Sequence, residues 1–582
     1  MIRLKKLYSE PSSFDPIVFS EGLNLILGEK SEGNNKTNGV GKSICIECIN
    51  FCLLKKEAES RLMLIPDGVL DSETIICLDI QINNEQLSIK RSLKEASQVS
   101  IFKNGAEVVN NGSIEIASNY LGKLYFDAFP ATQKRISFRN MLNPVMRDER
   151  SEFKDIIQCF DTKKRIPNDY TPHLFFLSLD IDLYTNTNDT IKEYANKTAY
   201  VREIKKVIEK KWNKLSIARQ KQNELEREVN KINASIEKLK NNTAFEVVQD
   251  ELIKLENELK NQRIEQKAIK YEIRQIESLP EPENISELDM SILFSQFKAG
   301  LGDMIAKSLQ EVKTFKAKID SFRNTLINAK VEKLKADLLT INKKIESLDT
   351  EYSSKLKLID KDGQILNDLK TTIRIFNEKS RELNDLSISL KNYLEAEQSK
   401  KTLLLKKQSG INDFSNHLEE KRSLVKEFEE TIIWAHEKII EKSNASFSLN
   451  TKFTSIIKEY LLVDYRIDDD GSWSTERMKV FLYDIALLFN KNTHTKHPNF
   501  LIHDNIFNID NDSLERSLNF IHEQTEKQTQ SFQYILTINR DIIESLEEKQ
   551  KLAFEVKDYK IASFTKKKRF LKKSYSEQKR KK

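Results

Sequence analysis

The chain has 582 residues, of which 32 % are charged, and only 14 are glycine and 10 are proline. This composition is typical of long solvated helices, which bury little surface per residue. Five cysteines are too few for a disulfide framework in a chain of this length, and no apolar run approaches the roughly 18 residues that span a bilayer. The first residues also lack the apolar core of a signal peptide, so we expect a soluble cytoplasmic protein that has no membrane partner.

Residues 1–185 alternate short apolar runs with turn signals, which predicts an α/β region. The predicted strands are residues 17–19, 23–27, 74–82, 87–91 and 99–103. The second of them leads into "LGEKSEGNNKTNGVGKS", and the run that follows reads as a helix. A strand, a glycine-rich loop and a helix in this order form the context of a phosphate-binding loop.

This loop is longer than the simple G-x-x-x-x-G-K-[ST] spacing, so we expect residues 29–37 to be looped out. The glycines would let backbone amides approach phosphate oxygens, Lys42 would reach the β- and γ-phosphates, and the Ser43 hydroxyl would bind Mg²⁺. The sequence therefore predicts ATP and Mg²⁺ as ligands. The residues expected to line the loop are Gly28, Asn38, Gly39, Gly41, Lys42 and Ser43.

From about residue 195 the apolar residues adopt the a/d spacing of a coiled coil. One such seam covers residues 225–239 and a second covers residues 331–348, and the prolines of "LPEPEN" separate them by breaking the helix. We therefore predict an antiparallel coiled-coil arm over residues 186–442, with its apex near 280–310. Two unrelated helices in a bundle are the alternative. Because no Cys-x-x-Cys lies near the apex, we expect no zinc hook there.

Helical patterning continues with breaks expected at residues 362–363 and 408–410, and a second α/β region follows at 443–563. In this region an apolar strand, residues 500–502, leads to Asp504. A carboxylate at the end of a strand is the Mg²⁺-organising group that a phosphate loop needs. An arm that leaves and returns explains how the two can meet, so we predict a single α/β head formed by both chain ends.

This arrangement resembles the ABC-type P-loop ATPases of the SMC and recombination-repair class, whose split head carries a long antiparallel coiled coil. "FNID", which ends in Asp510, resembles their D-loop, and "YILTIN" occupies their switch strand. "DGSWSTERMKVFLYDIALL" stands where their signature helix is expected, and Ser472 or Ser474 would offer a hydroxyl to the γ-phosphate held by a second head. The resemblance implies a homodimer through ATP-sandwiched heads.

More narrowly, the chain is similar to a bacterial SMC-like family of unknown function that is associated with ABC three-component conflict systems. The matching segments are "NGVGKSICIECINFCL", "SFRNMLNPVMRDE", "LGDMIAKSLQEVKTF", "SFRNTLI", "ERMKVFLYDIALL" and "FLIHDNIF". This resemblance implies anti-phage defence, ATP-dependent head dimerisation, DNA sensing, and accessory or effector subunits encoded nearby.

Some departures from the resembled class bear on catalysis. Asn505 replaces the glutamate that usually follows the Walker-B aspartate, and an amide cannot accept a proton. Hydrolysis should therefore be slow, or it should use another group such as His503 or Asp510. The switch histidine is replaced by Asn539, and Gln133 is the best Q-loop candidate. We expect a slow ATPase, with a nucleotide-gated scaffold or a repair ATPase that partners a nuclease as alternatives.

Cys45, Cys48 and Cys52 share one face of the helix after the loop. They lack a fourth ligand for zinc, and that face should pack on the sheet, so we expect them to be buried apolar residues.

The chain ends in a basic tail, predicted to be disordered over residues 564–582, whose last 17 residues carry ten Lys or Arg and one acid. Clustered cations bind nucleic-acid backbone, and Phe570 and Tyr575 are available to stack on bases. A solubilising end or an acidic protein partner is the alternative. The candidate DNA contacts are Lys566, Lys567, Lys568, Arg569, Lys572 and Lys573.

Overall fold

The computed structural model divides into two compact units, which are treated separately below. Unit 1 is built mainly from residues 1–188 and 409–582, and unit 2 is built mainly from residues 189–284 and 313–408. The structure describes residues 1–30, 39–129, 136–159, 161–164, 166–240, 249–277, 309–358, 363–453, 459–468, 473–507 and 511–575. Among them, no helix is long and apolar enough to cross a membrane.

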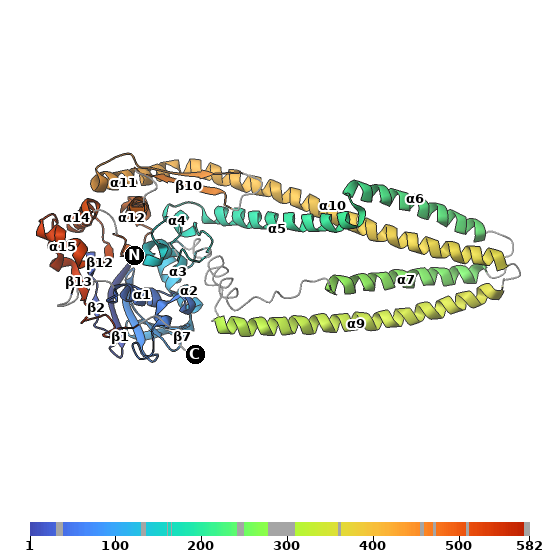
Figure 1. Cartoon of the computed structure of the whole chain (residues 1–582), viewed down its shortest axis with the longest axis horizontal. Helices are drawn as coiled ribbons and strands as arrows, with labels where there is room; N and C mark the ends of the chain where they lie inside the picture. The colour runs from blue at the N-terminus through green and yellow to red at the C-terminus, as the bar shows by residue number, and fades with distance from the viewer. Residues whose placement is uncertain are drawn as a thin grey trace. The chain divides into compact units, whose positions relative to one another are not determined.

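A parallel sheet at the centre of unit 1 combines strands from both chain ends, as predicted (Figure 1). Its order is β13-β3-β12-β11-β8, and every pairing in it is parallel. The strands are β3 (Gly22–Gly28), β8 (Met146–Arg147), β11 (Phe500–Asp504), β12 (Gln533–Asn539) and β13 (Lys560–Phe564). Because helices cover both faces of such a sheet, β3, β11 and β12 are buried at every position and are mostly apolar.

An antiparallel sheet, formed by the N-terminal half alone, has the order β2-β1-β4-β5-β6-β7. Asn104 and Gly105, with φ of 51° and 84°, make the turn between β6 and β7 that their sequence predicts. The predicted strands of this region are confirmed, whereas β1 and β7 were missed. The alternation of β1 is interrupted by lysines. The bounds are β1 (Ile2–Glu10), β2 (Ile17–Val18), β4 (Ile75–Ile82), β5 (Glu85–Ser92), β6 (Gln98–Lys103) and β7 (Ala106–Ser113).

Helix α1 (Lys42–Cys52) contacts β4 and β5 of the antiparallel sheet as well as β3 and β11 of the parallel sheet. Helix α12 (Trp473–Phe489) also contacts β11, and α14 (Asn511–Lys527) contacts β3. The hairpin of β9 (Ser446–Thr451) and β10 (Leu461–Arg466) packs on α11 (Arg422–Ile440). Other α-helices among the described residues of unit 1 are α2 (Ile114–Tyr125), α3 (Phe138–Met141), α4 (Thr171–Phe176), α13 (Lys491–His494), α15 (Arg540–Glu548) and α16 (Val556–Tyr559).

Helices α5 (Ile181–Trp212) and α10 (Gly363–Glu420) each lie partly in unit 1, as do the first four residues of α9 (Leu309–Leu358). The expected helix break at 408–410 is wrong, because α10 runs through it. A Cβ atom at Gly410 would lie 2.7 Å from Thr187 Oγ1, so glycine is needed there to let α5 and α10 approach each other. The sequence signal at this position therefore marks a close helix crossing.

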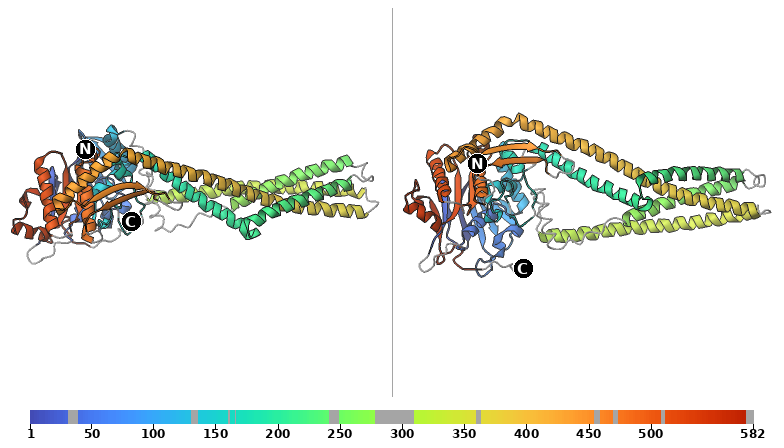
Figure 2. Two further views of the ribbon diagram at one scale, coloured as in Figure 1. Left: turned by 90° about the horizontal axis from the view of Figure 1, so that it is seen from above. Right: turned by 45° about the horizontal axis from the view of Figure 1, so that its top comes forward.

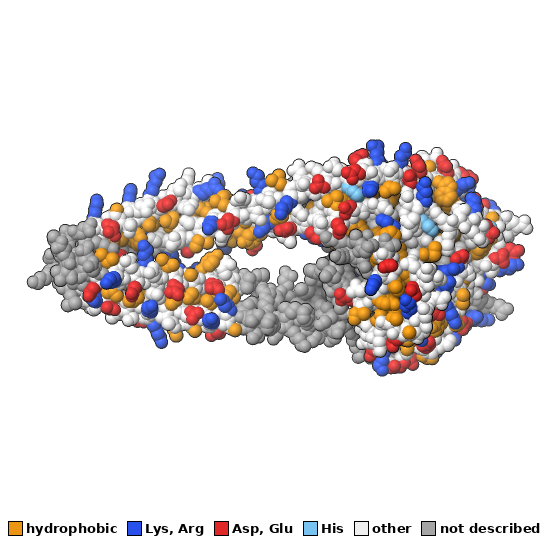
Figure 3. All heavy atoms as spheres, turned by 180° about the vertical axis from the view of Figure 1, so that it is seen from behind, with side chains coloured by type: hydrophobic (Ala, Val, Ile, Leu, Met, Phe, Trp, Pro, Cys, Tyr) orange, Lys and Arg blue, Asp and Glu red, His pale blue; other side chains and the backbone are white. Residues whose placement is uncertain are grey.

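Unit 2 contains the rest of α5, α9 and α10 together with α6 (Leu215–Lys240) and α7 (Gln249–Glu277) (Figure 2). The two predicted seams do not face each other. Leu225 of the first seam packs with Leu386 and Leu390 of α10, and Ile345 of the second packs with Leu255 of α7. The helices of unit 2 carry acidic and basic side chains interspersed along their exposed faces, as is usual for solvated helices (Figure 3).

Most of the expected apex lies outside the described residues, which stop at residue 277 and resume at 309. The predicted boundaries of the arm and of the two head halves therefore stay predictions.

Candidate functional site

The loop that joins β3 to α1 ends in a backbone conformation that only glycine adopts easily. Gly39 and Gly41 have φ of 69° and 108°, in the left-handed region. Gly41 caps α1, and its carbonyl accepts hydrogen bonds from the backbone N–H groups of Ile44 and Cys45 at 3.1 and 3.0 Å. The free N–H groups of the first turn and the helix dipole make this end of α1 suited to an anion. The predicted contact Asn38 and the insertion before it lie outside the described residues.

Lys42, the first residue of α1, is buried although it carries a charge. Its side chain is 8 % exposed, and its ammonium donates a hydrogen bond to Asn539 Oδ1 at the end of β12. Burial lowers the pKa of Lys42, while the nearby carboxylates of Asp504, Asp541 and Glu149 oppose this shift. A buried ammonium at the mouth of an anion-binding helix end is suited to phosphate.

Asp504 lies at the end of β11 and faces α1, as its proposed role requires. Its side chain is 1 % exposed, the Thr537 hydroxyl donates to its Oδ1 at 2.6 Å, and its carboxylate is hydrogen-bonded to the Ser43 side chain. The structure therefore brings together Lys42, Ser43 and Asp504, which come from opposite ends of the chain.

The electrostatics of Asp504 are unfavourable without a cation. Burial raises its pKa, the hydrogen bonds from Thr537 and Ser43 oppose this shift, and the carboxylates of Asp148 and Glu149 raise the pKa further. Magnesium prefers oxygen ligands and is usually held by one or two carboxylates together with phosphate oxygens. The hydroxyl and carboxylate of this site fit that ion, and the described residues contain no cluster of three or more His, Cys, Asp or Glu side chains that would form an all-protein metal site.

Asn505 follows Asp504 in the left-handed region, with φ of 61°. Asparagine adopts this conformation more readily than most residues, and a glutamate would be strained in it. The Asn505 backbone N–H donates to Thr537 O at 3.2 Å, and its carbonyl accepts from Arg477 Nη1 at 3.1 Å. Asparagine at position 505, in place of the expected glutamate, therefore suits the left-handed backbone conformation found there.

His503 is not brought into the site, because successive side chains of a strand point to opposite faces of the sheet. Its Nε2 lies 3.0 Å from Asp484 Oδ2 and its Nδ1 lies 3.1 Å from the Tyr534 hydroxyl. Arg147 Nε donates to the same Asp484 oxygen at 2.6 Å, and the side chains of Arg147, Asp484 and His503 are fully buried. Burial lowers the pKa of His503, so this residue belongs to a buried polar network on the α12 side. We therefore leave His503 out of the catalytic candidates.

Two carboxylates that the sequence reading did not assign lie beside Asp504. Strand β8 pairs in parallel with β11, with Arg147 opposite His503, so Asp148 and Glu149 emerge at the same edge of the sheet as Asp504. Both carboxylates raise the pKa of Asp504. A strand of two residues has no detectable periodicity, and only the topology shows its position.

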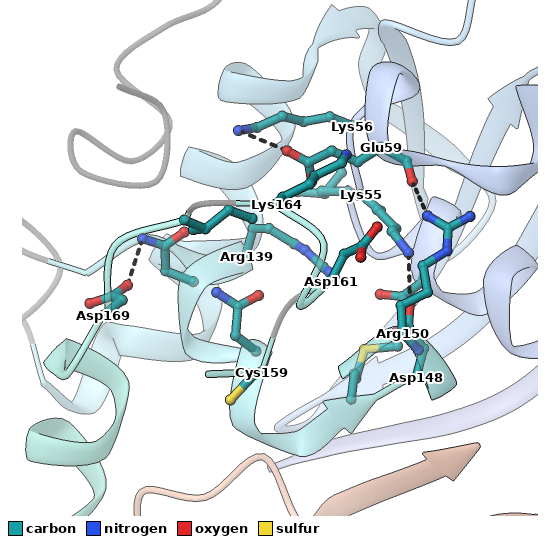
Figure 4. A pocket seen from close by; sticks show the side chains of 16 residues that line it. Lys55, Lys56, Glu59, Arg139, Asp148, Arg150, Cys159, Asp161, Lys164 and Asp169 are labelled. Atoms are coloured by element: carbon teal, nitrogen blue, oxygen red, sulfur yellow. Dashed lines mark hydrogen bonds and ion pairs between the residues drawn. The ribbon is translucent and has the colours of Figure 1, made fainter. Parts of the chain in front are cut away.

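Asp148 also reaches a charged pocket at the far end of α1 (Figure 4). Lys55 Nζ lies 3.3 Å from Asp148 Oδ2 and 2.7 Å from Glu47 Oε2, so the charge of Asp148 is already partly neutralised. The Asp148 carboxylate additionally accepts from the backbone N–H of Arg150 at 3.0 Å. These bonds leave Glu149, which is exposed, as the more accessible of the two new carboxylates.

The C-terminal tail is ordered where it passes the loop, which corrects the prediction of disorder for the part up to residue 575. Phe570 is 2 % exposed, and its ring centroid lies 4.4 Å from that of Phe14 and 5.3 Å from that of Phe564. It is therefore not available to stack on a base. Of the predicted DNA contacts, Lys568 and Lys572 lie 3.6 and 3.7 Å from the Asp15 carboxylate.

Some of the other predicted site residues lie within the described part of the chain and some lie outside it. Ser474 lies in α12 and is half-buried, whereas Ser472, Asp510 and Gln133 lie outside the described residues. Cys45, Cys48 and Cys52 are each fully buried in α1, so the prediction that they are buried apolar residues is confirmed.

The chain is similar to several known proteins. Residues 435–574 match a family described as "Uncharacterised protein conserved in bacteria (DUF2326)". The "Uncharacterized protein YydD" of Bacillus subtilis (strain 168) is 23 % identical over 567 residues, which cover 90 % of this chain and 91 % of that protein.

Two solved structures of Smc head domains also align with the chain. The Smc head domain with a coiled coil and joint from Pyrococcus yayanosii has a TM-score of 0.30 and 15 % identity, and covers 94 % of this chain and 93 % of its own. The Smc head domain bound to the C-terminal domain of ScpA, from Pyrococcus furiosus, has the same TM-score and 11 % identity, and covers 94 % and 92 %. A TM-score of this size is too low to establish a shared fold. The matches that rest on sequence are therefore the DUF2326 family model over residues 435–574 and the Bacillus subtilis relative over most of the chain.

Proposed function

We propose that unit 1 is an SMC-like ABC-type ATPase head that binds ATP with Mg²⁺ at the loop between β3 and α1. The observation that carries this proposal is the convergence of Lys42, Ser43 and Asp504. A glycine-capped helix end, a buried ammonium, a hydroxyl and a buried carboxylate together match the needs of a magnesium-bound triphosphate.

Each residue then has a defined task. Lys42 would exchange its hydrogen bond with Asn539 for one with the β- and γ-phosphates, because a charged acceptor binds an ammonium more strongly than an amide does. Ser43 and Asp504 would hold Mg²⁺, which when bound neutralises charge on the phosphates. Thr537 keeps the Asp504 carboxylate aimed at α1 through its 2.6 Å hydrogen bond.

Equilibrium titration with ATP tests this function. The wild-type chain should bind ATP more tightly with Mg²⁺ than with EDTA, and Lys42→Ala should weaken binding by at least tenfold. Lys30→Ala is a matched control, because Lys30 is an exposed lysine at the start of the same loop and pairs with Glu544 at 2.7 Å. The control should bind like the wild type. Equal affinity of Lys42→Ala and the wild type would reject the proposed site.

Turnover should be slow, because an amide occupies position 505. The alternative, a nucleotide-gated scaffold that binds ATP without hydrolysing it, is favoured by the same residue. Steady-state phosphate release, measured with and without DNA, separates the two. A low rate that Lys42→Ala abolishes indicates an ATPase, and tight binding without release under either condition indicates the scaffold.

We further propose that two heads sandwich ATP, with Ser472 or Ser474 of one head facing the γ-phosphate held by the other. Dimerisation of the heads would be coupled through the helices of unit 2 to DNA or to partner subunits, in anti-phage defence. The support for this step is the motif resemblance. ATP-dependent dimerisation in light scattering, lost in Lys42→Ala, is the expected result, together with loss of protection in phage plating. A monomer at saturating ATP would contradict the dimer.

A further inference from the structure

The basic C-terminal segment, residues 565–571, is tied to the backbone of the loop that carries Lys42. It follows β13, the strand that pairs with β3, and so starts beside the strand from which the loop itself emerges. The Arg569 guanidinium donates through Nη1 to Gly39 O at 2.8 Å. The backbone N–H of Phe570 donates to Val40 O at 3.1 Å. Two consecutive carbonyls of the loop are therefore held by this segment.

The contact is closely packed as well as hydrogen-bonded. A Cβ atom at Gly41 would lie 2.6 Å from Phe570 Cβ, so the segment occupies the space that any side chain at position 41 would need. The Phe570 ring is fixed between Phe14 and Phe564, and Leu571 is 4 % exposed. An apolar anchor thus holds one side of the segment while its polar groups hold the loop.

Peptide geometry gives this contact a consequence for anion binding. In a trans peptide the C=O of one residue and the N–H of the next point in opposite directions. Fixing the carbonyls of Gly39 and Val40 on the segment therefore aims the N–H groups of Val40 and Gly41 away from it. Consecutive N–H groups held in this way form the concave donor surface that phosphate oxygens use.

The charge of the segment acts at the same place. Lys566 Nζ lies 3.3 Å from the position that a Cβ atom of Gly39 would occupy, so its ammonium is next to the loop. Lys573 Nζ, just beyond the segment, donates to Gly68 O at 2.8 Å and ties the chain down on its other side. Of the cations predicted to bind DNA, Lys566 and Arg569 therefore lie at the loop.

We propose that residues 565–571 form a strap that holds the phosphate loop in its nucleotide-binding conformation, with Arg569 and Phe570 as positioning residues and Lys566 as an added cation for the bound phosphates. This inference rests on the proposed function, because it assigns a role to the strap only if the loop binds ATP. For Lys566 and Arg569, this proposal assigns the bound nucleotide and its loop as the partner, where the sequence predicted DNA.

Titration of ATP and of adenosine against the full-length chain tests the strap. Arg569→Ala removes a charge-assisted hydrogen bond from the loop, so ATP affinity should fall about tenfold while adenosine affinity stays unchanged. Arg569→Lys cannot reproduce the planar guanidinium and should restore only part of the loss. Lys557→Ala is the matched control, because Lys557 is an exposed cation nearby that pairs with Glu555. Phe570→Leu keeps an apolar side chain at the anchor, so it tests the packing against Phe14 and Phe564 without leaving a large cavity there.

The outcomes separate the strap from the nucleotide site. If the wild type binds ATP and Arg569→Ala binds it equally well, the strap is refuted and the proposed function stands. If Arg569→Ala weakens DNA binding alone, the tail is a nucleic-acid contact and the strap is again refuted. If the wild type does not bind ATP, both fail together. Weaker ATP binding, with an unchanged melting temperature in the absence of nucleotide, supports the strap.

Discussion

Replacing Asp504 by asparagine should make the nucleotide-free protein more stable and at the same time remove its stabilisation by Mg²⁺ and ATP. The carboxylate is 1 % exposed and lies near the acids Asp148 and Glu149, and burial is the largest cause of its raised pKa. Its charged form is therefore less favourable in the folded chain than in water. Asparagine has the same shape, carries no charge and can still accept the hydrogen bond from Thr537.

The magnitude follows from the groups around Asp504. Burying a carboxylate costs several kcal/mol, and each hydrogen bond from the Thr537 and Ser43 hydroxyls returns about 1.5–3 kcal/mol. Since the raised pKa shows that the balance is unfavourable, the variant should gain about 1–2 kcal/mol. A ligand at one hundred times its Kd stabilises the wild type by about 2.7 kcal/mol, and the variant should lose most of this.

Thermal unfolding with and without Mg²⁺ and ATP measures both effects in one experiment. Asp512→Asn is the matched control, because Asp512 is exposed and its hydrogen bond from Lys551 Nζ, at 3.0 Å, lowers its pKa. This control should lose a little stability and keep the full ligand shift. The reasoning fails if Asp504→Asn melts below the wild type without nucleotide and still shows the full shift.

Other variants test the rest of the account. The difference in unfolding free energy between Asp504→Asn and the wild type should grow as pH rises through the folded-state pKa of Asp504 and vanish below the ordinary carboxylate range. The reason is that the raised pKa of Asp504 means that folding favours the protonated acid. Unfolding over a pH series measures this difference, and a difference that grows toward low pH contradicts the prediction. Gly41→Ala should weaken ATP binding about tenfold or more in titration, since a positive φ costs about 1–2 kcal/mol and the Phe570 contact adds to it, whereas Gly68→Ala, with nothing within 4 Å, should have no effect. Arg147→Met should cost about 3–5 kcal/mol in chemical unfolding because it leaves the Asp484 carboxylate buried without its guanidinium partner, with only the His503 contact remaining. Unchanged stability would rule out that ion pair as a structural element.

The meeting of Lys42 and Asp504 was predictable because each lies in a local pattern. An apolar strand that runs into a glycine-rich loop, and another that ends in an acid, are visible within a few residues of sequence. The conformations of Gly39 and Gly41 follow from the same loop pattern. By contrast, β8 is too short to show a period, so its carboxylates could be placed only through the pairing of Arg147 with His503.

The strap and the helix pairings escaped prediction for different physical reasons. Among the ten cations of the tail, Phe570 was interpreted as a base-stacking residue, whereas Phe570 and Leu571 are buried and anchor the segment. In unit 2 a heptad pattern locates the apolar stripe of a helix but does not say which helix it faces, so Leu225 packs on α10 rather than on the second seam. At position 503 the direction of a strand side chain decided against a catalytic histidine.

The binding of Mn²⁺ in place of Mg²⁺, followed by electron paramagnetic resonance during titration in the presence of ATP, tests the magnesium–nucleotide site most directly. If Ser43 and Asp504 hold the ion beside the phosphates that Lys42 contacts, the wild type should bind Mn²⁺ only when ATP is present, and Ser43→Ala and Asp504→Asn should each weaken this binding by at least tenfold. Mn²⁺ binding that is the same in the wild type and in both variants would contradict the account.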